Sequence, residues 1–561
     1  MNRRQKIIIS VTGIFIVLLA LIGLTYAYFL TRITGNTNTN SISVTTADLK
    51  LVYDDGSDGV IGGELLEPSD EEFTKTFTVY NDGNVNIDYG VYLIDVINTF
   101  ERKDDLKYTM ECSTNGTLAC GQVTSETTFP SGISELVTAT IEPKKTHTYT
   151  FKFTYKDTGT DQSVDMGKVL KAKIQIFGKN NNGLIIPYET NTLAFNILNN
   201  GADITLTTTT GNFIGHELCG MDEATCVANV ADGCPGTCYE PGSEVTTTET
   251  KNTKIIKTTV NIDNIANGTS WDEELKDYTN DGLFSTEDDY GTSYYYRGPV
   301  SNNYVTFSNK CWRIVRIQGD GSIKLTLESQ SRCSEDMTSD FSIGSTNWGY
   351  KTENSKIIGD YKSSTSGMKN LLTTWLNVTN DSGVRTNITE SAEKWLKTEE
   401  WCLGNTTSAY AYSSPYALLG TTATENYTAG TSFYYETGRN LYGKGVTPNA
   451  TLKCNGETDT SKIGALTADE VVFAGGKAGS SNNNYYLQNG NYSWWTLSRS
   501  SFHGSISSYD IAFGVTHIGL LGDLGSVDML DDVRPAVSLN TGAKIISGEG
   551  TKGNPYIINE G

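Results

Sequence analysis

The residues best suited to recognise a small polar molecule lie between positions 494 and 531, in a segment rich in glycine and serine. Its aromatic rings can stack on the apolar face of a sugar, and its imidazole, guanidinium and carboxylate groups can hydrogen-bond the hydroxyls. We therefore predict that this segment forms a ligand-binding surface, with carbohydrate as its ligand. The predicted contact residues are Trp494, Trp495, Arg499, His503, Tyr509, His517, Asp523 and Asp528.

Two of these residue types have an ordinary structural alternative. Trp494 and Trp495 are neighbours, so on a strand their side chains would point to opposite faces, and we expect one to be buried and the other exposed. His503 and His517 are two of only four histidines, and a hydrogen-bonded structural role is favoured for either one over a contact with ligand.

A calcium-binding loop is an alternative in residues 277–288. Asp277, Thr279 and Asp281 occupy positions one, three and five of such a loop, with Gly282 at position six. Asp288 stands at position twelve, where a bidentate glutamate is usual, and no clear helical pattern flanks the segment. We therefore predict no cofactor and no metal, and we keep calcium as the alternative.

Carboxylate pairs that could act as acid and base are weakly indicated. Asp288 with Asp289, and Asp531 with Asp532, are neighbours in sequence, which is unusual for a catalytic pair. We predict that the protein is not an enzyme.

The N-terminus predicts export of the chain. Three cations at positions 3, 4 and 6 precede an uncharged apolar run at 7–30, and about 24 residues are enough to span the ~30 Å core of a bilayer as a helix. This charge distribution keeps the N-terminus inside and places the remainder outside. Thr25 and Ala27 also provide the small residues of a cleavage site, so the run is either a transmembrane anchor or a signal peptide.

Charge excludes one class of partner. The net charge is −22, although the first 35 residues carry four cations and no acid, so the remainder is strongly acidic. Nucleic acid and anionic lipid surfaces both need a positive footprint, and we predict no nucleic-acid partner.

Ten cysteines in an exported chain indicate disulfides. Spacing suggests three local pairs, Cys112 with Cys120, Cys311 with Cys333, and Cys402 with Cys454. Four more cysteines crowd a short stretch without the CxxC knuckles of a zinc ribbon, so two further disulfides are favoured over zinc there, with the pairing open. These four are Cys219, Cys226, Cys234 and Cys238.

Residues 36–200 are predicted to form a β-sandwich, because apolar residues recur at every second position. The turn Asn-Asp-Gly-Asn at 81–84 stands between two such runs and indicates a hairpin. The alternating sets are Val85, Ile87, Tyr89, Val91 and Leu93, then Tyr149, Phe151, Phe153 and Tyr155, and then Leu170, Ala172, Ile174 and Ile176.

The rest of the chain divides into a linker and a second domain. Residues 201–262 are rich in threonine and contain the four crowded cysteines, which indicates a disulfide-stapled linker. Residues 263–561 hold all eight tryptophans and are predicted to form an α+β domain. A helix is expected after Ser366 from the apolar spacing of Met368, Leu371, Leu372, Trp375 and Leu376.

Three strings of the N-terminal third resemble the camelysin and TasA type of exported matrix and fibre proteins of Gram-positive bacteria. They are TYAYF at 25–29, NSISVTTADLKL at 40–51 and FTVYNDGNVNIDYGVYL at 77–93. The resemblance implies a jelly-roll-like or immunoglobulin-like sandwich. Protease activity, claimed for some relatives, is not expected, because HELCG from His216 lacks the second histidine of a HExxH helix.

Several ordered strings after residue 288 resemble an uncharacterised domain of surface proteins from gut-dwelling Gram-positive bacteria. They include DDYGTSYYYRG at 288–298, CWRIVRIQGDGSIKL at 311–325 and SGEGTKGNPYIIN at 547–559. LTADEVVFAGG at 466–476, WWTLS at 494–498 and VRPAVSL at 533–539 also resemble the fold shared by C-type lectins and formylglycine-generating enzymes. The oxidase branch needs a late cysteine pair, and the last cysteine here is Cys454.

Together these patterns predict a bacterial cell-surface protein, anchored by residues 1–35 or secreted after their removal, that displays a C-type-lectin-like domain on a β-sandwich stalk. Its expected role is adhesion, with a glycan or protein on another cell or in the matrix as its partner. The alternatives are a structural matrix or fibre protein and an exported glycan-active enzyme.

Overall fold

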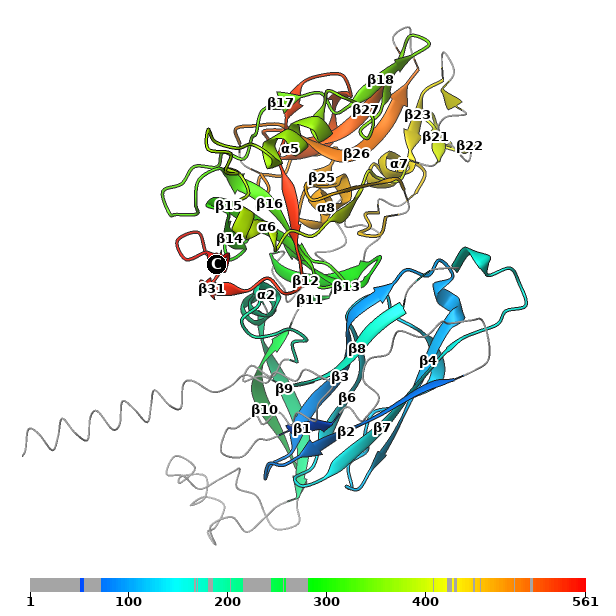
Figure 1. Ribbon diagram of the computed structural model, residues 1–561, viewed down its shortest axis with the longest axis vertical. Coiled ribbons are helices and arrows are strands. Elements are labelled where there is room, and N and C mark those ends of the chain that lie inside the picture. The colour runs from blue at the N-terminus through cyan, green and yellow to red at the C-terminus, as the bar shows by residue number, and fades with distance from the viewer. Residues whose placement is uncertain are drawn as a thin grey trace, which may run out of the picture.

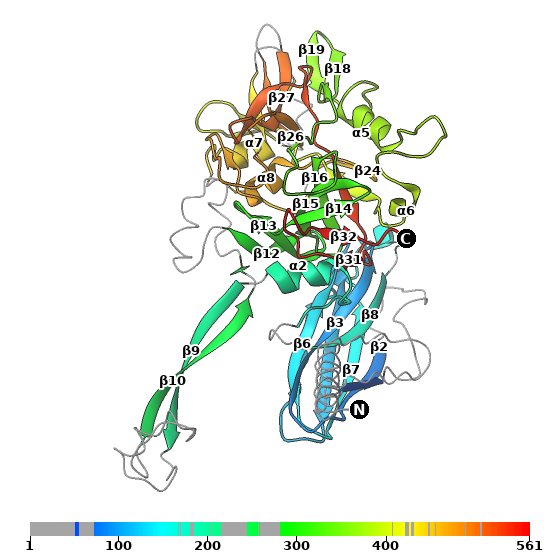
Figure 2. The ribbon, with the colours of Figure 1, turned by 90° about the vertical axis from the view of Figure 1, so that its left-hand side faces the viewer.

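The computed structural model describes residues 51–54, 72–165, 168, 170–179, 185–201, 203–214, 244–255, 257–258 and 281–561, the last range with gaps at 407, 421–425, 428–430, 447–448, 455, 489 and 505–507. The described chain is dominated by β-strands arranged in several sheets (Figure 1). Two large hydrophobic cores divide it into a sandwich and a C-terminal domain, which lie one above the other in Figures 1 and 2.

The sandwich consists of two antiparallel sheets that enclose the first core. One sheet has the order β1 (Leu51–Asp54), β2 (Phe73–Asn81), β7 (Thr146–Tyr155), β4 (Leu106–Thr114) and β5 (Val123–Thr128). The other has the order β6 (Ser134–Ile141), β3 (Ile87–Asn98) and β8 (Leu170–Gly178), and two 3-10 turns, η1 (Lys103–Asp105) and η2 (Ser163–Asp165), join strands.

The alternating pattern predicts the inward faces of this sandwich correctly. On β7, Tyr149, Phe151, Phe153 and Tyr155 are all buried, and the four alternating residues of β8 are buried as well. A polar contact joins the two sheets inside this core, because the Tyr89 hydroxyl lies 2.6 Å from His147 Nδ1 and 2.7 Å from the Tyr149 hydroxyl. The sheets are therefore held in register by hydrogen bonds as well as by apolar packing.

The predicted hairpin at 81–84 is wrong. β2 pairs with β1 and β7, whereas β3 pairs with β6 and β8, so the turn carries the chain from one sheet to the other. Asn81 fixes this crossover, because its side-chain amide donates to the carbonyls of Val85 (2.8 Å) and Ile141 (3.0 Å), and its Oδ1 accepts from Gly83 N. The Asn-Asp-Gly-Asn pattern correctly indicates a turn, but it does not determine which sheet the next strand joins.

The C-terminal domain is built on two larger mixed sheets. The nine-stranded sheet contains β11 (Lys257–Thr258), β12 (Gly282–Asp288), β13 (Gly291–Arg297), β15 (Lys310–Ile317), β14 (Tyr304–Phe307), β32 (Tyr556–Ile558), β31 (Ile545–Ser547), β16 (Ile323–Ser329) and β30 (Ala536–Leu539). The 11-stranded sheet contains β18 (Tyr350–Glu353), β19 (Lys356–Gly359), β27 (Ser508–Val515), β26 (Trp494–His503), β23 (Phe433–Tyr435), β21 (Ala409–Ala411), β22 (Leu418–Gly420), β17 (Ser345–Thr346), β29 (Asp531–Asp532), β25 (Lys477–Ala478) and β28 (Leu520–Ser526).

Short helices and two small ribbons complete the described part of the chain. The helices are α2 (Leu193–Gly201), α5 (Met368–Leu376), α6 (Glu390–Glu393), α7 (Glu436–Leu441) and α8 (Ala468–Phe473), and β20 (Glu399–Cys402) pairs with β24 (Thr458–Ser461). α5 confirms the helix predicted from apolar spacing. α8 starts with a capping box, in which Glu470 N donates to the Thr467 hydroxyl and Thr467 N donates to the Glu470 carboxylate.

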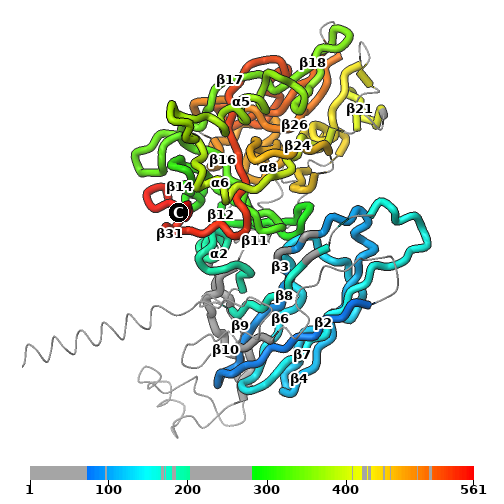
Figure 3. Tube along the Cα trace, in the orientation of Figure 1, coloured from blue at the N-terminus to red at the C-terminus, as the bar shows by residue number. Residues whose placement is uncertain are grey.

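The segment before the predicted linker belongs to the core of the C-terminal domain. Leu193, Ala194, Ile197 and Leu198 of α2 are buried in that core, and Leu193 N donates to Ala543 O. Figure 3 shows the C-terminal strand β31 running beside α2. Part of the predicted linker forms an antiparallel ribbon, β9 (Asp203–Ile214) with β10 (Glu244–Ile255), and the four crowded cysteines lie outside the described residues.

A glycine turn fastens the sandwich to the C-terminal domain. Ile133 N donates to Gly319 O at 3.0 Å, and a Cβ at Gly132 would lie 1.9 Å from the Tyr290 carbonyl oxygen. This approach is closer than any real Cβ contact, so only glycine fits at position 132 in the docked arrangement. The two domains meet here through their backbones.

None of the described helices has the length and apolar character needed to span a bilayer. The apolar run at 7–30 lies outside the described residues.

Candidate functional site

The predicted tryptophan pair is part of the core. Trp494 and Trp495 are each only 1% exposed, so the expectation that one of them faces solvent is wrong. Trp495 Nε1 donates to Thr346 O (3.0 Å), and Trp494 packs against Phe341 with ring centroids 6.2 Å apart. Both faces of the 11-stranded sheet are covered at this point, so alternation along β26 does not separate core from surface.

The other predicted contact residues are not brought together at one point. His503, Tyr509 and Asp523 lie along one surface of the 11-stranded sheet, whereas Arg499 belongs to a cavity described below. Two further predicted residues belong neither to that surface nor to that cavity. His517 is exposed in the turn after β27, and Asp528 lies beyond β28 and accepts a hydrogen bond from Ser526.

His503 and Tyr509 belong to a surface rich in tyrosine, here called the tyrosine surface. The rings of Tyr412 and Tyr434 stack with centroids 4.6 Å apart and planes 7° apart, and His503 stacks on Tyr509 at 5.6 Å. Tyr412 also meets His503 edge to face, at 6.3 Å. The whole surface consists of Tyr410, Tyr412, Tyr416, Tyr434, Tyr442, His503 and Tyr509.

The tyrosine surface combines open aromatic area with charged groups. Tyr412 is 40% exposed, Arg439 lies over the Tyr410 ring at 4.1 Å, and Lys444 lies near two further rings. The Tyr442 hydroxyl donates to Asp523 Oδ1 at 3.0 Å. Burial raises the pKa of Tyr442, so this phenol keeps its proton at neutral pH.

Sequence reasoning missed the tyrosines of this surface. They occur in the strings AYAYSSPY at 409–416 and FYYETGRNLY at 433–442, which are far from the segment on which the prediction concentrated. The density of tyrosine in both strings was the available signal. What the sequence could not show is that β21 pairs with β23 and β23 with β26, which sets these rings beside His503.

Arg499 lines a cavity of about 700 Å³. Its Nη1 lies 3.1 Å from Asp510 Oδ2, and it also donates to the hydroxyls of Tyr427 and Tyr435. Burial raises the pKa of Asp510, although Arg499 opposes that shift. Because these partners satisfy Nη1, the primary role of Arg499 in this structure is to pair a buried carboxylate.

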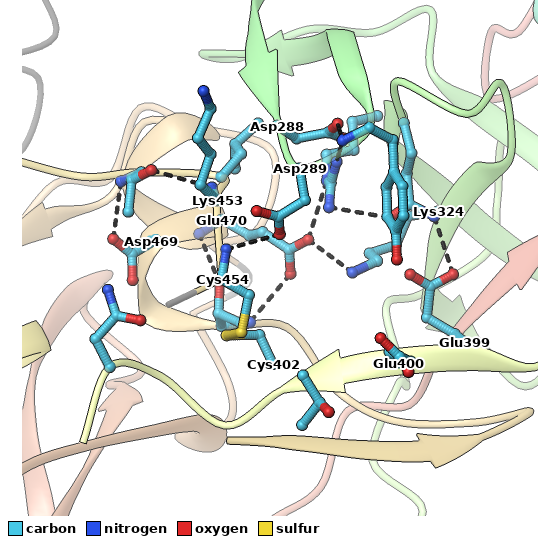
Figure 4. A pocket seen from close by; sticks show the side chains of 18 of the residues that line it. Asp288, Asp289, Lys324, Glu399, Glu400, Cys402, Lys453, Cys454, Asp469 and Glu470 are labelled. Atoms are coloured by element: carbon cyan, nitrogen blue, oxygen red, sulfur yellow. Dashed lines mark hydrogen bonds and ion pairs between the residues drawn. A yellow bond between two sulfur atoms is a disulfide. The ribbon is translucent and has the colours of Figure 1, made fainter. Parts of the chain in front are cut away.

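A second cavity, here called the junction cavity, lies where the sandwich meets the C-terminal domain (Figure 4). Its volume is about 670 Å³, and it is lined by residues 98–101 and 103 of the sandwich and by residues of β12, β15, β20 and α8. The disulfide Cys402–Cys454 forms part of its wall. Volumes of this size are usual for binding sites of small molecules.

Buried ion pairs form the inner side of the junction cavity. Arg316 Nη1 lies 2.6 Å from Asp288 and its Nε lies 3.1 Å from Glu470, while Lys324 Nζ lies 2.8 Å from the same Glu470 oxygen. Burial alone would raise the pKa of Glu470, but Lys324 and Arg316 outweigh it and lower that pKa to about 2. Glu470 is therefore a fixed anion at neutral pH.

Two other carboxyls of the junction cavity have raised pKa values, whereas the pKa of Glu470 is lowered. Burial raises the pKa of Asp469 to about 7, although the backbone N–H of Thr451 partly opposes it. Burial also raises the pKa of Asp289, which accepts a hydrogen bond from Cys454 N at 2.8 Å. Acids with raised and lowered pKa values thus stand side by side in one cavity, which is common at functional sites.

We expect replacement of Asp469 by asparagine to change how stability depends on pH. The pKa of this carboxyl in the folded protein, about 7, lies above the ~3.9 of an unfolded chain. Its contribution to the free energy of unfolding is therefore fully present below about pH 4 and is lost as the pH rises through 7. Asparagine cannot ionise. When the pH is raised from 5 to 8, the free energy of unfolding of D469N should therefore increase by at least about 1 kcal/mol relative to that of the parent protein. Urea unfolding at the two pH values measures this, and equal pH dependence would contradict the assignment.

Among the described residues, no group of histidine, cysteine, aspartate and glutamate side chains is placed to hold a metal ion. Asp277 and Thr279 of the calcium-loop alternative lie outside those residues, and Gly282–Asp288 form strand β12. Asp288 pairs with Arg316 and accepts from Gly319 N, so its carboxylate is directed at protein donors.

The three disulfides predicted from spacing are all present. Cys112–Cys120 lies in the sandwich, and Cys311–Cys333 and Cys402–Cys454 lie in the C-terminal domain. Such bonds hint at an oxidising environment outside the cytosol.

The sequence matches no protein-family model and no curated protein, and the fold matches no solved structure.

Proposed function

We propose that this is an exported cell-surface protein that captures carbohydrate through the tyrosine surface and thereby mediates adhesion. The observation that carries the proposal is the exposed Tyr412 ring stacked on Tyr434, with His503, Arg439 and Lys444 around it. Flat rings bind the apolar face of a pyranose, and neighbouring charged groups hydrogen-bond its hydroxyls. The sequence segment first expected to bind ligand contributes His503, Tyr509 and Asp523 to this surface.

The proposal includes the finer architecture suggested by resemblance. The sandwich would be a jelly-roll-like or immunoglobulin-like stalk related to camelysin and TasA, and the C-terminal domain would be lectin-like. The two packed antiparallel sheets support the first part, and strands mixed with short helices support the second. Residues 1–35 would act as membrane anchor or as signal peptide, and the partner would be a glycan or protein on another cell or in the matrix.

Alanine at Tyr412 and Tyr434 is expected to weaken carbohydrate binding about tenfold or more, since loss of a central aromatic contact typically costs more than about 1 kcal/mol. The oxidised protein should be tested on immobilised neutral, amino and acidic oligosaccharides. Y80A on β2 of the sandwich is a matched control, because it removes a half-buried tyrosine that is not part of the tyrosine surface. Binding that persists in the double variant, or no binding to any oligosaccharide, would overturn the proposal.

A further inference from the structure

The junction cavity exists only when the two domains are docked. The sandwich supplies residues 98–101 and 103 to its lining, and the remaining lining residues come from the C-terminal domain. The contact between Ile133 and Gly319 fastens the two parts. A ligand in this cavity would therefore touch both domains.

Negative charge is in excess around the junction cavity. Seven of its lining residues carry carboxyl groups and four carry cationic groups. Arg316 and Lys324 neutralise Asp288 and Glu470, and Lys397 reaches Glu399 at 3.3 Å. Among the described residues, no cation lies within ion-pair distance of the remaining three carboxyls of the C-terminal lining, which are Asp289, Glu400 and Asp469.

Two of these carboxyls are held in fixed orientations by one short segment. Thr451 N donates to Asp469 Oδ1 at 3.0 Å, and Cys454 N donates to Asp289 Oδ2 at 2.8 Å. The disulfide to Cys402 fixes the end of this segment. In Figure 4 the side chain of Lys453 extends away from both carboxyls, so it pairs with neither of them.

We propose that the junction cavity binds an amino sugar, with its ammonium group paired to Asp469 and a hydroxyl hydrogen-bonded to Asp289. An ammonium ion meets the unpaired carboxylate of Asp469, and a hydroxyl group of the sugar donates to the carboxylate of Asp289. An anionic ligand is disfavoured by the excess of carboxylates. This site is separate from the tyrosine surface and takes a charged rather than a neutral sugar.

The first test is calorimetric titration of the full oxidised protein with glucosamine and with N-acetylglucosamine at pH 7. N-acetylation replaces the ammonium group of glucosamine by a neutral, bulkier amide, so glucosamine should bind at least about tenfold more tightly than N-acetylglucosamine. D469N should lose at least about tenfold in glucosamine affinity, while D381N, which changes an exposed aspartate of the same domain, should not. Binding should also weaken at pH 5, where Asp469 takes up its proton.

A second variant tests the site without changing its charges. G132V cannot dock as the native turn does, because of the contact with the Tyr290 carbonyl, and should lose glucosamine binding while both carboxyls remain. The double variant Y412A/Y434A should retain it, which separates this site from the proposed tyrosine surface. Equal affinity for both sugars, no binding of glucosamine, or full binding by D469N would each overturn the proposal.

Discussion

Replacement of Arg316 by methionine should destabilise the C-terminal domain by about 3–5 kcal/mol. Arg316 is 7% exposed and is the shared partner of Asp288 and Glu470. Its removal leaves two buried carboxylates with only Lys324 nearby, which is the situation in which breaking a buried ion pair is most costly. The same change also removes the hydrogen bonds from Arg316 to Ser293 and Gln318.

Tryptophan fluorescence during urea unfolding measures this effect selectively. All eight tryptophans lie beyond residue 270, and the sandwich has none, so the signal reports the C-terminal domain alone. R332M is the matched control, since Arg332 is exposed and contacts Asn309 at the surface, and it should change stability by no more than about 0.5 kcal/mol. A value for R316M equal to that of the control would contradict the importance given to the buried ion pairs.

Loss of the Cys402–Cys454 disulfide, in the double variant C402A/C454A, should lower the stability of the same domain by about 4 kcal/mol. The two cysteines are 52 residues apart, and closing a loop of that length removes a large part of the freedom of the unfolded chain. The bond also holds the segment that orients Asp289, so affinity for glucosamine should fall with it. Urea unfolding followed by tryptophan fluorescence gives the free energy.

The Cys112–Cys120 disulfide provides the control for this second prediction. Its cysteines are only 8 residues apart and lie in the sandwich, which contains no tryptophan. Removing it should cost about 2.6 kcal/mol in the sandwich and leave the tryptophan-detected transition in place. If both double variants shift that transition equally, the two domains unfold as one unit, and it is wrong to assign the tryptophan-detected transition to the C-terminal domain alone.

Local patterns predicted the local parts of this fold. The alternation in β7 and β8 and the helix α5 depend on residues close together in sequence, the three disulfides join consecutive cysteines of the described chain, and the structure contains all of them. Alternation reports which side of a strand is covered. It does not report the partner strand, which is why the turn at 81–84 was assigned to a hairpin although it crosses between sheets.

The candidate sites depend on contacts that no local pattern contains. Trp494 and Trp495 are both buried because other segments cover both faces of β26. The tyrosine surface needs β21, β23 and β26 side by side, and the junction cavity needs Asn98 of one domain near Asp469 of the other. Tyrosine-rich strings and adjacent acids were visible in the sequence, but their neighbours were not.

The core of the C-terminal domain joins residues from both ends of a long stretch of chain, and this has a consequence for the order of assembly. Ile186 and Ile558 belong to the same core, and β32 pairs with β14 about 250 residues earlier. The domain therefore cannot close during synthesis until residue 558 has emerged, whereas the sandwich is complete at residue 178. The sandwich would then already be folded when the later half is made, with Gly132 and Ile133 in place to contact the C-terminal domain.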